Sequence, residues 1–125
     1  MTENEISKTI LDASIKIHKG LGPGLLESVY EEVLAYELQK NVLSCQRQVP
    51  IPVVYETVKM ELGFRADIIV EKKVIIELKS VESLQSVHSK QLLTYLKVSG
   101  LKLGLLINFN ETLLKNGITR VVNNL

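Results

Sequence analysis

Two acidic residues and a lysine stand among isoleucines and valines in the middle of this 125-residue chain. They are Asp67, Glu77 and Lys79, and they lie in the segment FRADIIVEKKVIIELKS at residues 64–80. Carboxylate oxygens without cysteine or clustered histidine favour Mg²⁺ or Mn²⁺ as the bound ion. A lysine beside such an ion could position or deprotonate water, or stabilise a charged transition state. Together these residue types suit metal-assisted attack of water on a phosphate group.

The spacing of these residues predicts that both acids lie on one face of a β-hairpin. A three-residue loop at residues 71–73 would place Asp67 directly opposite Glu77, and directly opposed side chains share a face. Lys79 shares that face because side chains alternate along a strand. A two-residue turn would send the two carboxylates to opposite faces, so the hypothesis depends on the odd loop.

The charges on this hairpin allow two interpretations. Adjacent carboxylates repel each other at neutral pH, and a divalent cation between them relieves that repulsion. Alternatively, the three charged residues form a salt-bridged cluster at a strand end, which is the more common origin of so short a string. In both cases the opposite face is wholly apolar and is expected to be the core side; its residues are Ala66, Ile68, Val70, Val74, Ile76 and Leu78.

Helical patterns are found on both sides of this hairpin. Apolar residues recur at spacings of three and four over residues 5–18, which predicts a first helix. The run GLGPG ends it, and Pro23 suits the first turn of a second helix that continues to about Lys40. A third helix is predicted over residues 84–98, ended by Gly100.

β-Branched residues dominate residues 43–80 and predict three strands. Pro50 and Pro52 place the first strand at a sheet edge, because proline cannot donate to a ladder. A further strand is expected in KLGLLINF, a short helix or turn in ETLLKNG, and a last strand in ITRVV. Helices on both sides of a strand block predict an α/β (α+β) sandwich with a mixed central sheet, in the order ααβββαβ(α)β.

Length and composition predict one domain over residues 1–125. The net charge of +1 neither favours nor excludes a nucleic-acid partner, since an enzyme that grips a few phosphates needs only a local basic patch. A single cysteine, Cys45, and the absence of a signal-like start make the cytoplasm the expected location. The apolar runs are too short to span a bilayer, so no membrane partner is expected.

The string formed by Asp67, Glu77 and Lys79 resembles the D-x(n)-E-x-K signature of the PD-(D/E)XK nuclease superfamily, with Ala66 in place of the nominal proline. The resemblance implies a restriction-endonuclease-like core with a mixed sheet flanked by helices. It also implies that the two carboxylates and the Leu78 backbone carbonyl bind one or two Mg²⁺ or Mn²⁺ ions. Lys79 would then serve the attacking water.

Two helical strings extend this resemblance. Gly24, Glu27 and Tyr30 in GLLESVY fit the GxxExxY string for which a family of small proteins is named. Gln91 and Tyr95 in QLLTY resemble the QxxxY element of the exonuclease-like branch of the superfamily. The phrases LGPGLLESVYEEVLAYEL, FRADIIV, IIELKSV, QLLTYLK, LGLLINF and GITRVV follow in the family's order, so the resemblance covers nearly the whole chain.

The resemblance implies supporting roles for residues on the helices. Glu27 would be a further metal ligand or would orient water, although a first-turn glutamate is also favoured by the helix dipole alone. Gln91 and Tyr95 would contact the substrate backbone or support the lysine and the metal. His88 lies on the same helix face and could contact a phosphate, or it is an ordinary surface or core histidine.

The function implied by the resemblance is that of a divalent-metal-dependent nuclease that hydrolyses phosphodiester bonds of DNA or RNA, with DNA favoured. The alternative is a non-catalytic module for nucleic-acid binding or protein assembly that retains the nuclease fold. A third hypothesis is a component of a restriction, repair or toxin-type system that acts only with a partner protein. Since the chain holds little beyond the nuclease core, specificity would come from a homo-oligomer or a partner protein, or the protein would have none.

Overall fold

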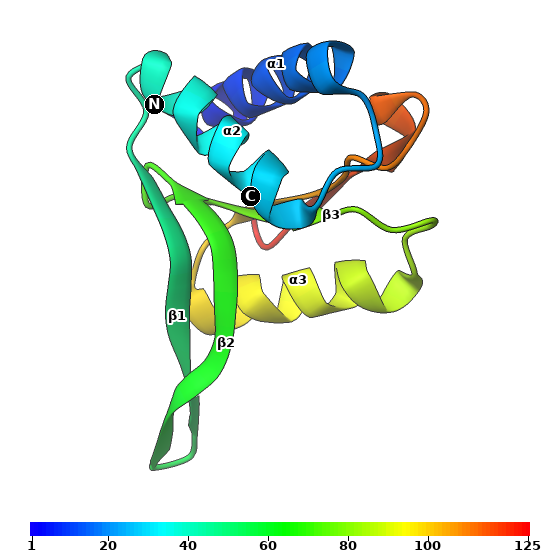
Figure 1. Ribbon diagram of the computed structural model, residues 1–125. Helices are drawn as coiled ribbons and strands as arrows, with labels where there is room; N and C mark the ends of the chain where they lie inside the picture. Colours follow the sequence, from blue (N-terminus) through cyan, green and yellow to red (C-terminus); the bar gives the residue numbers. More distant parts are fainter.

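A mixed sheet of five strands runs through the molecule, with helices on both of its faces (Figure 1). The computed structural model describes the backbone of residues 1–125 and every side chain except those of Glu61 and Leu62. In chain order the elements are α1 (Glu3–Leu21), α2 (Glu27–Lys40), β1 (Cys45–Tyr55), β2 (Val58–Val70), β3 (Val74–Lys79), α3 (Ser86–Ser99), β4 (Leu103–Asn108), the 3₁₀ helix η1 (Leu114–Gly117) and β5 (Ile118–Val122). This sequence of elements confirms the predicted ααβββαβ(α)β order.

The strands lie side by side in the order β1-β2-β3-β4-β5. Neighbours are antiparallel except β3 and β4, which are parallel and joined by the crossover through α3. A parallel pair needs such a long connection. Strand β1 is at the edge, as Pro50 and Pro52 predict. The topology is that of the expected restriction-endonuclease-like α/β fold.

Apolar side chains form a core on each face of the sheet. Helices α1 and α2 cover one face and α3 covers the other (Figure 1). On the hairpin, Ile69 and Ile75 pack with Leu92 and Leu96 of α3, although they lie on the face that carries the charges. The prediction of a single core face was therefore incomplete, because the crossover brings α3 over the second face. The α1/α2 side has the predicted residues Ile68, Val70, Val74, Ile76 and Leu78.

One residue of the expected core face lies in the other cluster. Ala66 is buried against the α3 side of the sheet together with Ile69. The regular alternation of faces is interrupted next to it, since Gln48, across from Asp67 in the register of β1 and β2, has a φ of 50°. A φ of 50° is outside the β region, so the pleat is broken where Gln48 faces Asp67. The prediction for Ala66 was wrong because it assumed that side chains alternate without interruption along β2.

The second helix begins later than predicted. The sequence predicts Pro23 in its first turn, but α2 begins at Glu27. Gly24 has a φ of 96°, which a residue in a helix cannot adopt. The turn is held by the Tyr30 hydroxyl, which donates a hydrogen bond to the Gly22 carbonyl at 2.6 Å. Among the described helices, none combines the length and the hydropathy that a bilayer crossing requires.

Gly104 of β4 allows α3 to pack closely on the sheet. A Cβ atom at this position would lie 2.9 Å from three side-chain carbons of Leu92, which is itself buried. Since overpacking a core costs about 1–3 kcal/mol, we expect Gly104→Ala to lower the melting temperature by several degrees. Gly20→Ala is the matched control: Gly20 has no such neighbour within 4 Å, and alanine favours the α1 helix. Equal melting of Gly104→Ala and the native protein would contradict this packing.

Candidate active site

The hydrogen-bond ladder between β2 and β3 ends just before the two acids. Three residue pairs join the strands on either side of the predicted three-residue loop. Beyond these three pairs, backbone N–H groups of the two strands donate to carboxylate side chains and not to backbone carbonyls. The Leu78 N–H donates to Asp67 Oδ2 at 2.9 Å, and the Asp67 N–H donates to Glu77 Oε1 at 3.4 Å. Both carboxylates therefore lie together where the two strands separate, as the odd loop predicts.

The electrostatics of this pair are unfavourable without a cation. Glu77 retains 8% exposure, and the pKa of its carboxyl is raised from an ordinary value of 4.5 to about 9. Burial is the main cause, the neighbouring Asp67 contributes to the rise, and the charge of Lys79 opposes it. A divalent cation placed against both carboxylates would offset the desolvation and the repulsion.

The raised pKa of Glu77 predicts how Glu77→Gln changes stability in the absence of metal. Between pH 4.5 and about 9 the folded protein retains a proton that the unfolded chain has lost, so the free energy of unfolding falls as pH rises through this window. An uncharged glutamine removes that dependence. We expect Glu77→Gln to be more stable than the native protein at pH 8, by on the order of 3 kcal/mol, and nearly equal to it at pH 5.

Thermal unfolding in EDTA, measured from pH 5 to pH 8, tests this expectation. Glu82→Gln is the control, because Glu82 is exposed and should show no such pH-dependent gain. Adding Mn²⁺ should favour the native protein over Glu77→Gln, since a neutral amide is a poorer ligand than a carboxylate. A constant difference in melting temperature across the pH range would show that Glu77 is already ionised at pH 5.

A cleft of about 770 Å³ opens beside Asp67, at the start of α2. The Glu27 carboxylate accepts a hydrogen bond from the Ser80 N–H at 3.2 Å, and the Ser80 hydroxyl donates to the Leu25 carbonyl at 2.7 Å. These bonds connect the start of α2 to the end of β3 and place Glu27 in the cleft with Asp67. Polar residues that line the cleft include Glu27, Glu31, Gln48, Asp67, Ser80 and Asn110.

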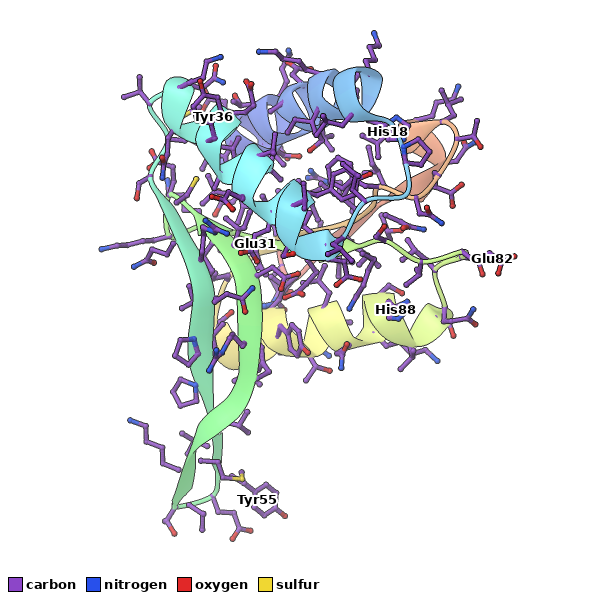
Figure 2. The ribbon with its side chains drawn as sticks, viewed as in Figure 1. His18, Glu31, Tyr36, Tyr55, Glu82 and His88 are labelled. Atoms are coloured by element: carbon purple, nitrogen blue, oxygen red, sulfur yellow. The ribbon has the colours of Figure 1, made fainter. Side chains whose placement is uncertain are left out.

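Three polar residues around this cleft were not identified from the sequence. Glu31 of α2 is buried with 6% exposure, and Figure 2 shows it on the side of α2 towards β1 and β2. Its Oε2 accepts a hydrogen bond from Arg47 Nε at 3.0 Å and forms an ion pair with Nη2 at 2.9 Å, while its Oε1 accepts a hydrogen bond from the Gln48 amide. Because residues four apart share a helix face, the spacing of Glu31 from Glu27 could have indicated it. Arg47 and Gln48 carry no comparable signal in the sequence.

Lys79 has a different environment from the acids. It is half-buried, and its charge acts on Glu77. Within the part of the chain that the structure describes, the Lys79 ammonium forms no ion pair and no side-chain hydrogen bond. The geometry therefore does not support the salt-bridged cluster that spacing alone favoured.

Tyr95 approaches the acid pair from α3. Its ring stacks on Phe64, with 3.6 Å between the ring centroids. Burial raises the pKa of the Tyr95 hydroxyl, and the charges of Glu77 and Asp67 raise it further, which shows that they lie within its electrostatic reach. Gln91, one turn earlier on α3, is exposed. Among the three polar residues predicted to share a face of this helix, Tyr95 is one on which the charges of the two carboxylates act.

A ring nitrogen of each of the two histidines forms a contact with the backbone, away from the two acids. The His88 Nδ1 accepts a hydrogen bond from the Gln85 N–H at 3.0 Å, at the start of α3. This assignment leaves the ring proton on Nε2, which is available to a further partner. The His18 Nε2 lies 2.7 Å from the Glu111 carbonyl oxygen. In Figure 2 His88 lies on α3, across the sheet from Glu31 on α2.

The donor set is small but suits a hard divalent cation. Among the described residues, no three His, Cys, Asp or Glu side chains converge in the way that an all-protein metal cage requires. Mg²⁺ commonly takes only one or two carboxylates and completes its coordination with water and substrate. Because the N–H and C=O of one strand residue point to the same neighbour, the Leu78 carbonyl lies on the side of Asp67. Asp67, Glu77 and this carbonyl therefore fit such an ion.

The chain was compared with protein families, curated proteins and solved structures. A family model described as the PD-(D/E)XK nuclease superfamily matches residues 4–121. The chain belongs to this superfamily. No curated protein and no solved structure matched it. Membership in the PD-(D/E)XK superfamily agrees with the restriction-endonuclease-like sheet and makes a metal-dependent nuclease acting on nucleic acid the expected class of activity.

Proposed function

We propose that this protein is a divalent-metal-dependent nuclease that hydrolyses phosphodiester bonds, with DNA favoured over RNA as the substrate. The observation that carries the proposal is the pair of carboxylates, Asp67 and Glu77, held side by side where β2 and β3 separate. Lys79 lies close enough for its charge to act on Glu77. Two carboxylates held together in this way, with Glu77 buried, are suited to a cation and are costly without one.

The proposed catalytic residues are Asp67, Glu77, Lys79 and Glu27. Asp67, Glu77 and the Leu78 carbonyl would hold one or two Mg²⁺ or Mn²⁺ ions. When bound, such an ion polarises the phosphate and supplies hydroxide near neutral pH. Lys79 positions or deprotonates the attacking water. Glu27 acts from the wall of the cleft as a further ligand or by orienting water, since the Ser80 N–H occupies only one of its oxygens.

The substrate is proposed to lie between the cleft and α3. Gln91 is exposed on α3 and would bind the nucleic-acid backbone, with Tyr95 behind it and His88 Nε2 near the helix start. We also propose that the chain belongs to the GxxExxY family and to the QxxxY branch of the superfamily. In support, Gly24 and Tyr30 shape the turn before α2, while Glu27 lies in the cleft. Specificity would come from a second copy or a partner protein, with the cytoplasm as the expected location.

Incubation of the purified protein with end-labelled single- and double-stranded DNA and RNA tests the proposal. We expect cleavage with Mg²⁺ or Mn²⁺, none in EDTA, and loss of cleavage in the Asp67→Asn variant. Cleavage that persists in EDTA or in that variant would come from another source and would remove the proposal. Nucleic-acid binding without cleavage, with both metals tested, would favour the non-catalytic alternative.

A further inference from the structure

Gln48 occupies a position between two carboxylates that belong to different elements. Its Nε2 donates one hydrogen bond to Glu31 Oε1 on α2 and another, at 3.4 Å, to Asp67 Oδ1 on β2. An amide nitrogen carries two protons and no negative charge, so it can satisfy two anions at once. With an apolar side chain at this position, no hydrogen-bond donor would lie between the two carboxylates.

Glu31, the partner of Gln48 on α2, is held in place by further contacts. Glu31 is buried, and the Arg47 guanidinium holds its other oxygen through two nitrogens. Because the Arg47 guanidinium already balances its charge, Glu31 is poorly suited to bind a metal itself, whereas Asp67 forms no ion pair with any residue that the structure describes. Glu31 instead provides a stationary acceptor that determines where the Gln48 amide lies.

The backbone of β1 is distorted at the same residue. Gln48 has a φ of 50°, in the left-handed region that residues other than glycine rarely adopt. Such strain persists only where the surroundings compensate for it, and it tends to cluster at functional sites. The distortion lies across from Asp67 in the register of β1 and β2, where it turns the amide towards both carboxylates.

We propose that Gln48 is a positioning residue for the Asp67 carboxylate, anchored through Glu31 to Arg47. With Gln48 on Oδ1 and the Leu78 N–H on Oδ2, both oxygens of Asp67 are oriented by hydrogen bonds. Partners of this kind typically change metal affinity by about 10- to 100-fold. The inference rests on the proposed function, because it assumes that Asp67 binds the metal.

Two variants separate the side chain from the backbone. Gln48→Met keeps the length of the side chain and removes the amide. Gln48→Gly also removes the amide but suits the positive φ, so in EDTA it should melt above Gln48→Met. Gln46→Met is the matched control, because Gln46 lies on the same strand and is exposed like Gln48, but its side chain forms no hydrogen bond with any residue that the structure describes. Mn²⁺ titration calorimetry without nucleic acid is the primary readout.

We expect both Gln48 variants to raise the Kd for Mn²⁺ by about tenfold, and the control to leave it unchanged. With DNA, kcat at limiting Mn²⁺ should fall while KM is retained, and excess Mn²⁺ should restore kcat. A native Kd in either Gln48 variant would overturn the inference while the proposed function stands. Failure of the native protein to bind Mn²⁺ would overturn the inference and the proposed metal site together.

Discussion

Replacing Asp67 with asparagine is expected to lower the rate of metal-dependent cleavage by about a thousandfold or more, because the pair of carboxylates loses one of its two charges. The same substitution should abolish Mn²⁺ binding in a titration without substrate. Asparagine retains a side-chain carbonyl oxygen that can accept the hydrogen bond from the Leu78 N–H, so the fold should be preserved. Loss of activity would then report on the charge and not on unfolding.

The matched control for this variant is Asp12→Asn. Asp12 is an exposed residue of α1, where it pairs with Lys8 one turn away. An exposed pair of this kind contributes little to stability, so activity and Mn²⁺ affinity should remain at the native level. If Asp67→Asn cleaves DNA at the native rate, the acid pair is not the metal site and the assignment of Asp67 is wrong.

Replacing Lys79 with methionine is expected to lower kcat by about 10²- to 10⁴-fold, the range in which a positioned proton-transfer group contributes. Methionine keeps much of the apolar stem and removes the charge. Since Lys79 forms no ion pair with any residue that the structure describes, the melting temperature in EDTA should change little. Mn²⁺ binding should persist, which distinguishes this variant from Asp67→Asn.

Two comparisons clarify the role of Lys79. Lys90→Met is the control, because Lys90 lies on the exposed face of α3, and it should keep full activity. Lys79→Arg preserves the charge, but its guanidinium cannot release a proton in a protein. Activity retained by Lys79→Arg would indicate that the residue stabilises the transition state, whereas activity lost in both variants would indicate proton transfer. Full activity in Lys79→Met would exclude either role.

The acid pair could be predicted because it depends on local features. The length of the loop at residues 71–73 determines the register of the hairpin, and the register determines that Asp67 lies beside Glu77. The order of helices and strands follows from periodicity and from turn residues in the same local way. The burial of the second face also had a signal, since the adjacent apolar runs IIV and VII are typical of strands covered on both sides.

The network around Gln48 could not be predicted in this way. Gln48 meets Glu31 across 17 residues of sequence, and only the packing of α2 against β1 brings them together. A positive φ at a glutamine also has no sequence signature, because glycine, asparagine and aspartate are the residues that usually mark such positions. The late start of α2 depends likewise on a tertiary contact, the Tyr30 hydroxyl on the Gly22 carbonyl.

Asp67 serves as an acceptor for the backbone of β3 at the point where the ladder of β2 ends. A relative without nuclease activity would still be selected to keep an acceptor there, because a buried N–H without a partner costs about 1–3 kcal/mol. Persistence of this aspartate among relatives would therefore reflect folding as much as catalysis. The Lys79 side chain forms no comparable bond within the fold that the structure describes. Loss or retention of this lysine should therefore distinguish inactive relatives from active ones better than loss or retention of the acids.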